Sequence, residues 1–290
     1  MGTLLGFAAI LMWALLALLT ALSGDVPPFQ LAAMSFAIAS LIGLVMLKLR
    51  GVGLGVFRQR PAVWIVGVAG LFGYHALYFA ALRNAPAAEA SLIAYLWPLL
   101  IVLGSASLPG ERLRWFHALG AILGLCGAAL IVTRGGGVSL DPRYAVGYGL
   151  AILCALTWSS YSLLSRRFGD VPSDVVTGFC LATAVLSLFA HLAFETTVWP
   201  SSSTEWLAVL MLGLLPVGGA FYVWDYGVKH GDIQLIGAAS YAAPLLSTLV
   251  LVAAGEAEMR FEIAAAAVLI TLGAGLAALP LFRRLSRRAA

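Results

Sequence analysis

Long apolar segments follow one another along this chain, with only short polar interruptions between them. A helix needs about 20 predominantly apolar residues to cross the roughly 30 Å hydrocarbon core of a bilayer. Because the apolar runs are continuous rather than alternating, they exclude a membrane β-barrel. We therefore expect an all-α integral membrane protein with ten transmembrane helices. The predicted spans are about 3–22, 29–48, 62–82, 87–108, 115–133, 145–166, 173–194, 205–227, 233–254 and 261–281.

The connecting segments are too short to form a soluble domain, so the helices themselves must carry the function. Only 10% of the residues are charged, against about 25% in soluble domains. The first apolar run begins at residue 3 without a small-residue cleavage site after it, which predicts a retained helix and not a signal peptide. The cysteines Cys126, Cys154 and Cys180 all fall inside predicted helices at a spacing that suits no metal. We expect no metal site and no nucleic-acid partner.

The basic residues predict the orientation of the chain, because Lys and Arg concentrate in cytoplasmic loops. Of the 17 Lys and Arg residues, 13 lie in the even-numbered gaps between helices or in the C-terminal tail, and 4 lie in the odd-numbered gaps. The tail alone contributes Arg283, Arg284, Arg287 and Arg288. We expect both termini in the cytoplasm and an even number of spans, in a bacterial inner membrane.

An ordered series of matches, at an offset of 145 or 146 residues, relates the two halves of the chain. The sequence Gly-Asp-Val-Pro at 24–27 recurs at 169–172, and each copy follows a tryptophan twelve residues before its aspartate. The further pairs are Trp13 with Trp158, Tyr95 with Tyr241, Pro98 with Pro244, Gly110-Glu111 with Gly255-Glu256, and Arg114 with Arg260. The sequence therefore predicts two repeats, at 1–134 and 145–290, joined by a linker at 135–144.

Each predicted repeat contains five helices, an odd number, so the two repeats must enter the membrane from opposite sides. Inverted repeats related by an axis in the membrane plane are a transporter architecture, with the substrate site near the midplane between them. We expect a central cavity at this interface.

The repeat pattern resembles the drug/metabolite transporter superfamily, of the EamA-like type. The features that carry the resemblance are an Ala-rich fourth helix with a proline, a following Gly-Glu loop and a Gly-rich fifth helix. They are found here at residues 90–99, 110–111 and 120–127 and again, in part, at 236–245 and 255–256. The second copy departs from the pattern after Glu256, where Ala257-Glu258 replaces Arg-Leu. The aromatic-rich third and fourth helices look most like those of the YddG-type exporters of aromatic amino acids. The resemblance implies ten helices, a central cavity, no bound cofactor and transport in the direction of export.

Candidate cavity residues are the aromatic and titratable side chains that lie deep in predicted helices. Tyr74 and Tyr78 share one helix face, with His75 beside them. His75 is the only titratable group well inside a helix; it is either a neutral, hydrogen-bonded packing residue or a cavity residue that modulates transport. The other candidates are Tyr95, Trp97, Trp158 and Tyr241 for substrate contact, and Trp13, Pro98 and Pro244 for gating or kinks. Helix packing is the alternative interpretation of the aromatic residues. Asp225 and Lys229, spaced i, i+4 near a helix end, are expected to form a surface ion pair.

Transport of small amphiphilic solutes is the function that these features favour. An intramembrane enzyme needs a nucleophile with a base or a metal cluster, and no such motif is present. A sensor or scaffold usually carries a soluble output domain. Phosphorylated solutes need buried Lys or Arg, which no predicted helix has at mid-depth. We predict a monomeric exporter of aromatic and other apolar amino acids, with other metabolites or drugs as the alternative cargo.

Overall fold

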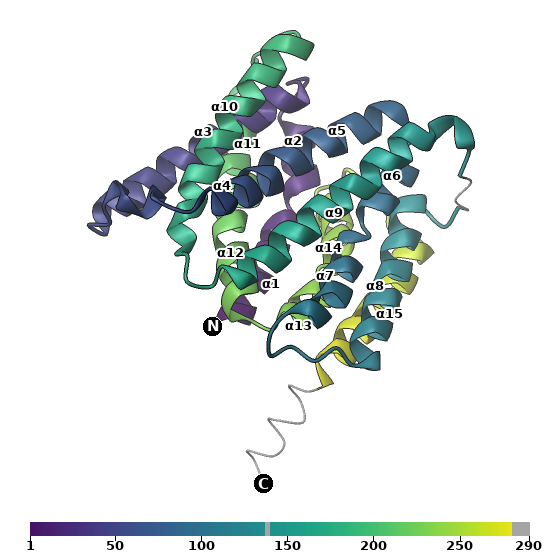
Figure 1. Cartoon of the computed structure of the whole chain (residues 1–290). Helices are drawn as coiled ribbons and strands as arrows, with labels where there is room; N and C mark the ends of the chain where they lie inside the picture. The colour runs from purple at the N-terminus through teal and green to yellow at the C-terminus, as the bar shows by residue number, and fades with distance from the viewer. Residues whose placement is uncertain (137–139, 280–290) are drawn as a thin grey trace.

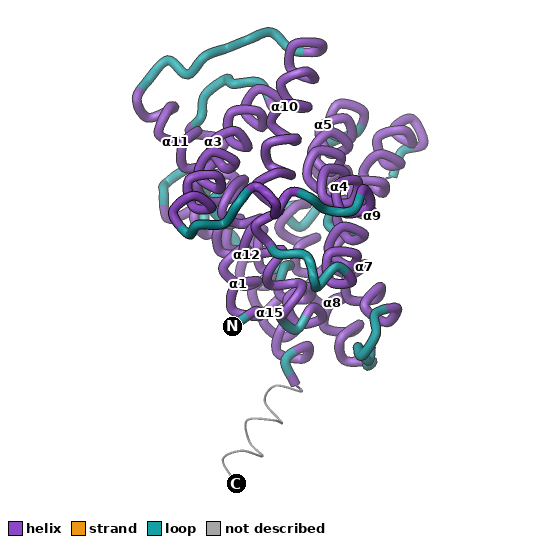
Figure 2. The backbone as a smooth tube through the Cα atoms, turned by 60° about the vertical axis from the view of Figure 1, so that its left-hand side comes forward, coloured by secondary structure: helices purple, strands orange, loops and turns teal. Residues whose placement is uncertain are grey.

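A computed structural model describes residues 1–136 and 140–279, and every regular element in this part of the chain is helical (Figure 2). Nine helical segments are long and apolar enough to cross a membrane, and they coincide with the first nine predicted spans to within a few residues. They are Gly2–Leu22, Pro28–Leu49, Pro61–Asn84, Ala87–Ser107, Trp115–Thr133, Pro142–Arg167, Ser173–Phe194, Ser203–His230 and Ile233–Ala253. The protein is therefore a multi-pass membrane protein.

A tenth apolar helix, α15 (Phe261–Ala277), is shorter, at 17 residues within the described part of the chain. It corresponds to the predicted span 261–281, whose last two residues lie outside the described residues. The basic tail at 283–288 and residues 137–139 of the predicted linker also lie outside them.

Five of the membrane segments are interrupted near their middle. The first consists of α1 (Gly2–Trp13) and α2 (Leu16–Leu22), the fourth of α6 (Ala87–Ala94) and α7 (Trp97–Gly104), and the ninth of α13 (Ile233–Ala239) and α14 (Ala242–Ala253). The third consists of α4 (Pro61–Val68) and α5 (Tyr74–Asn84), joined by the π-helical segment η2 (Ala69–Gly73). In the eighth, the π-helical segment η6 (Leu215–Gly219) joins α11 (Ser203–Leu214) to α12 (Ala220–His230). Segments of π-helix occur frequently at functional sites, and these two directly precede cavity-lining turns.

The helices pack in pairs (Figure 1). Helix α3 (Pro28–Leu49) lies along α10 (Val176–Phe194), and α8 (Trp115–Thr133) lies along α15. Helix α9 (Ala145–Arg167) packs on α5, and α1 packs on α12. Small residues allow the closest approaches, as is usual where helices pack within a bilayer. A Cβ placed on Gly227 would lie 2.8 Å from the Cα of Gly6, so larger side chains at this point would force α1 and α12 apart.

The chain ends of these helices define two faces of the bundle. We call the face that holds Met1 and the loops at 50–60, 105–114, 168–172 and 230–232 the N-terminal face. The opposite face, with the loops at 23–27, 85–86, 195–202 and 254–260, we call the distal face. The assignment follows from contacts between loops, such as the hydrogen bond from Asp232 N to Thr3 Oγ1 on the N-terminal face.

Ion pairs join the first 134 residues to the rest of the chain across the N-terminal face. Arg50 pairs with Asp174, Arg166 with Glu111, and Arg60 with Asp170 at 3.4 Å. Arg166 also donates hydrogen bonds to the carbonyls of Val228 and Gly231, both at 2.8 Å, and to that of Lys229 at 3.3 Å. A guanidinium at this position satisfies the last carbonyls of α12, so it fastens the end of α12 to α9.

Candidate functional site

A cavity of about 290 Å³ lies between the broken helices, in the half of the bundle toward the distal face. Its distal part is formed by α2, α5, α6, α14 and the π-helical segment η6, and residues of α1, α7, α9 and α12 complete the wall. The lining residues include Leu16, Ala17, Ser91, Pro216 and Ser247. The lining residues within the described part of the chain include no Asp, Glu, Lys or Arg. The cavity is therefore an uncharged pocket inside a membrane protein.

Six of the seven predicted substrate-contact residues line this cavity, namely Tyr74, His75, Tyr78, Tyr95, Trp97 and Trp158. The rings of Tyr74 and Tyr78 are nearly parallel, with centroids 6.1 Å apart, as the i, i+4 spacing on α5 predicts. The Tyr74 ring also contacts Trp158 of α9, at 5.5 Å. Ring faces from two different helices therefore form one continuous aromatic wall.

Polar atoms in the wall are few and come mainly from neutral groups. Tyr78 Oη and Ser91 Oγ lie 2.9 Å apart and share a hydrogen bond between α5 and α6. His75 Nδ1 lies 2.7 Å from the carbonyl oxygen of Leu71, one turn earlier. Since a carbonyl only accepts, His75 carries its proton on Nδ1, and a neutral ring presents Nε2 as an acceptor. The wall thus offers hydroxyl and imidazole groups to the polar end of a solute.

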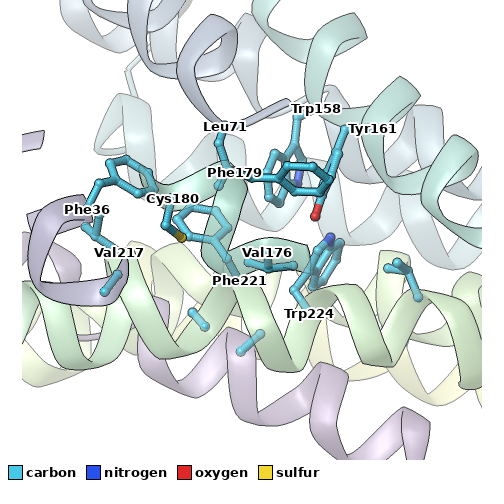
Figure 3. Close-up of a cluster of buried hydrophobic side chains, with 14 of the residues drawn as sticks. Phe36, Leu71, Trp158, Tyr161, Val176, Phe179, Cys180, Val217, Phe221 and Trp224 are labelled. Carbon is cyan, nitrogen blue, oxygen red and sulfur yellow. The ribbon is translucent and has the colours of Figure 1, made fainter. Parts of the chain in front are cut away.

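Four tryptophans close the cavity on the side of the N-terminal face. Trp13, Trp97, Trp158 and Trp224 form a cluster in which every pair of ring centroids lies between 4.9 and 6.2 Å apart. Trp13 Nε1 donates a hydrogen bond of 3.1 Å to the carbonyl of Pro216 in the π-helical segment η6. Figure 3 shows Trp158, Trp224 and the neighbouring Phe221 lying together inside the bundle. We call the four tryptophans, Trp13, Trp97, Trp158 and Trp224, the tryptophan floor.

The prolines lie just after the helix interruptions. Pro98 is the second residue of α7 and Pro244 the third of α14, and a two-residue turn separates each of these helices from the helix before it. A proline cannot donate the hydrogen bond that would continue the preceding helix.

Tyr241 departs from the sequence expectation, because it does not line the cavity. Its side chain is fully buried between α8 and α7, where its ring packs against Gly124. Its hydroxyl accepts a hydrogen bond of 3.1 Å from the backbone N–H of Leu99. Leu99 lies in the first turn of α7, where a backbone N–H has no partner within its own helix. Tyr241 therefore has a structural role here.

The expected surface ion pair of Asp225 and Lys229 is in fact buried. The side chains are 1% and 2% exposed, and Lys229 Nζ lies 2.7 Å from Asp225 Oδ2. Both residues are near the end of α12, but the loop that contains Val171 and Ser173 covers them. The prediction that Asp225 and Lys229 are exposed was based on their position near a helix end. That position does not show which loop folds over the end of the helix.

Two aromatic residues of the site, Phe221 and Trp224, were not among the residues predicted from the sequence. Phe221 lines the cavity and Trp224 belongs to the tryptophan floor. The repeat could have identified both residues. At the offset of 146 residues that pairs Tyr95 with Tyr241, Phe221 matches His75 and Trp224 matches Tyr78. Within residues 1–136 and 140–279, no group of three or more His, Cys, Asp or Glu side chains is arranged to hold a metal ion.

Comparisons with known proteins find one family model, several relatives and a solved structure that cover nearly the whole chain. The model of the EamA-like transporter family matches residues 1–133 and 145–279. The chain is 56% identical to an aromatic amino acid exporter, YddG, of Ancylobacter novellus, over 96% of this chain and 97% of that protein. It is 28% identical to the aromatic amino acid exporter YddG of Salmonella typhimurium, over 98% of each chain. A solved crystal structure with 55% identity superposes with a TM-score of 0.92 over 96% of this chain and 97% of that one.

Proposed function

The chain belongs to the EamA-like transporter family, and from this premise we propose that it exports aromatic and other apolar amino acids. Phenylalanine, tryptophan, methionine and leucine are the substrates that we favour. The observation that carries the proposal is the uncharged cavity, whose wall consists of aromatic rings with a few hydroxyl and imidazole groups. Such a wall accepts a flat or apolar side chain on ring faces while polar atoms hold the other end.

The arrangement of the chain in the membrane is part of this proposal. We place ten spans in a bacterial inner membrane, as two inverted repeats of five helices at 1–134 and 145–290, with both termini cytoplasmic. The two segments that the family model matches coincide with these repeats. The π-helical segments at 69–73 and 215–219 are related by the same offset of 146 residues, which also supports the repeat. Reporter fusions at residue 290 and in the Gly135 loop are expected on opposite sides of the membrane.

With this orientation, the cavity lies on the periplasmic side and the tryptophan floor closes the cytoplasmic side. Alternating access then requires that the ion pairs across the N-terminal face separate and that the floor opens. The exposed pair of Arg60 and Asp170 costs little to break. The broken helices supply hinges close to the cavity, since an interrupted helix bends more readily at the interruption than elsewhere.

The residues that we propose for substrate contact are those on the cavity wall: Tyr74, His75, Tyr78, Tyr95, Trp97 and Trp158. Trp13 is proposed as a gate residue, because it joins the tryptophan floor to the π-helical segment η6. Loss of one stacked ring costs about 0.5–1.5 kcal/mol beyond the buried area. The corresponding loss of affinity is about 2- to 13-fold.

The test is transport of a panel of labelled amino acids by the purified protein in proteoliposomes, with and without a pH gradient. Alanine variants at Tyr74, Tyr78, Tyr95, Trp97 and Trp158 are compared at equal protein content. Tyr226→Ala is the matched control, because the Tyr226 ring stacks on His230 and does not line the cavity. Normal transport in all five cavity variants would assign these rings to packing. Absence of any amino-acid transport by the wild-type protein would refute the proposed function itself.

A further inference from the structure

The buried pair of Asp225 and Lys229 lies beyond the tryptophan floor, outside the cavity. Asp225 accepts hydrogen bonds from Lys229 Nζ at 2.7 Å and from Ser173 Oγ at 2.6 Å, both through Oδ2. Lys229 Nζ donates a second bond, of 2.9 Å, to the carbonyl of Val171. Tyr161 Oη of α9 donates a further bond, of 3.5 Å, to Asp225 Oδ1. Two opposite charges are therefore kept out of water by the loop between α9 and α10 together with α4 and α9.

The pair continues a column of residues that begins in the cavity. Val217, Phe221, Asp225 and Lys229 follow one another at intervals of four residues, so they lie along one side of the helical segment formed by η6 and α12. Val217 and Phe221 line the cavity, whereas the two charged residues lie between the tryptophan floor and the N-terminal face. A solute that moves from the N-terminal face into the cavity along this side passes the ion pair first.

Opening the N-terminal face changes the partners of both charges. Ser173 and Val171 belong to the segment that joins α9 to α10, and this segment must withdraw from α12 before a solute can enter there. Its withdrawal removes the Ser173 hydroxyl from Asp225 and the Val171 carbonyl from Lys229. The two charges keep each other, and Asp225 keeps Tyr161, but each loses one hydrogen bond. Because an unsatisfied buried polar group costs free energy, each charge can accept a replacement partner while the face is open.

A free amino acid carries the two groups that replace these partners. Its ammonium group donates hydrogen bonds as Ser173 and Lys229 do, and its carboxylate accepts them as Val171 and Asp225 do. The cavity wall, by contrast, includes no charged side chain among the described residues. A small void of about 10 Å³ already lies against Asp225 and Lys229, which is about the room that one water molecule requires.

We propose that Asp225 and Lys229 form an entry site for the amino-acid head group, with the substrate carboxylate on Lys229 and the substrate ammonium on Asp225. The proposal rests on the proposed function, because it takes a free amino acid as the substrate. The site selects for both head-group charges before the side chain reaches the aromatic cavity. The cavity then selects for the apolar side chain.

The test measures uptake of labelled phenylalanine into inside-out membrane vesicles, in competition with three compounds. Phenylalanine has both charges, phenylalaninamide has only the ammonium, and 3-phenylpropionate has only the carboxylate. The wild-type protein is expected to prefer phenylalanine over each of the other two by about tenfold or more, because hydrogen bonds to charged groups are strong. Lys229→Gln is expected to lose the preference over phenylalaninamide, and Asp225→Asn the preference over 3-phenylpropionate.

Two variants serve as controls for the charge effects. Asp170→Asn removes an exposed carboxylate on the same face, 73% exposed in its pair with Arg60, and is expected to keep both preferences. Lys229→Arg keeps the charge and is expected to keep them too. Variants of Asp225 and Lys229 that transport phenylalanine with both preferences intact would overturn the proposal.

The experiment stays decisive if the neutral variants fail to reach the membrane. The wild-type preferences are then measured alone, and a preference of less than about twofold over either analogue would overturn the entry site. This outcome differs from failure of the proposed function, in which wild-type vesicles take up no phenylalanine at all.

Discussion

The hydrogen bond between Tyr78 and Ser91 offers the sharpest test of how the cavity holds the polar end of a solute. Its two oxygens lie 2.9 Å apart in the wall, and each has capacity for a further bond to a ligand. Tyr78→Phe removes one oxygen and keeps the ring, so the apolar contact area hardly changes. A neutral hydrogen bond contributes about 0.5–1.5 kcal/mol, which corresponds to about 2- to 13-fold in Kd.

We therefore expect Tyr78→Phe and Ser91→Ala each to weaken phenylalanine binding within this range. Because the two hydroxyls already bond to each other, they act as one unit, and their effects should not add. The double variant is expected to bind only slightly more weakly than the weaker single variant.

The measurement is equilibrium binding of labelled phenylalanine to the purified protein in lipid nanodiscs. Tyr222→Phe is the matched control, since its hydroxyl bonds Thr177 at 3.1 Å and the carbonyl of Ala39 at 3.2 Å, away from the cavity. An unchanged Kd in both single variants and in the double variant would show that the two hydroxyls do not bind the solute. Equal weakening by Tyr222→Phe would lead to the same conclusion.

Three further outcomes follow from the geometry. His75→Gln is expected to keep transport between about pH 5 and pH 8, because a neutral side chain is tolerated there; complete loss of transport in a folded variant would instead indicate obligatory proton coupling. Arg166→Gln removes the hydrogen bonds to the end of α12 and the pairing with Glu111, so hydrogen–deuterium exchange should rise in the loop after α12. Unchanged exchange would show that Arg166 does not hold the end of α12 against α9. Tyr241→Phe leaves the Leu99 N–H without its partner and should lower stability by about 1–3 kcal/mol, seen as a lower melting temperature with unchanged Kd; a large change in Kd would return Tyr241 to the binding site.

The sequence was sufficient to predict where the membrane segments lie, because segment position depends on the length of an apolar run. It was also sufficient to bring Tyr74 and Tyr78 together, because residues four apart share a helix face at any rotation of that helix. It was not sufficient for Tyr241. Hydropathy fixes the depth of a residue but not the direction in which its helix turns it, and Tyr241 is turned toward α8.

The exposure of the ion pair could not be predicted for a different reason. The i, i+4 spacing of Asp225 and Lys229 predicts that they pair, and they do. Their burial depends on a loop that is distant in sequence and that closes over the end of α12. Burial by a loop that is distant in sequence leaves no local pattern. The repeat offset, by contrast, did indicate Trp224, because it pairs this residue with Tyr78.

The two π-helical segments have a consequence for how this cavity can change. A π-helical turn contains one residue more than an α-helical turn, and each residue of an α-helix advances by about 100°. Conversion of Ala69–Gly73 from π- to α-helix, with no change in the number of residues, would therefore rotate the whole of α5 relative to α4 by about that angle. Tyr74, His75 and Tyr78 would turn away from the cavity together, and other side chains of the same helix would take their place. A local change from π- to α-helical hydrogen bonding at this point would exchange an entire wall of the cavity at once.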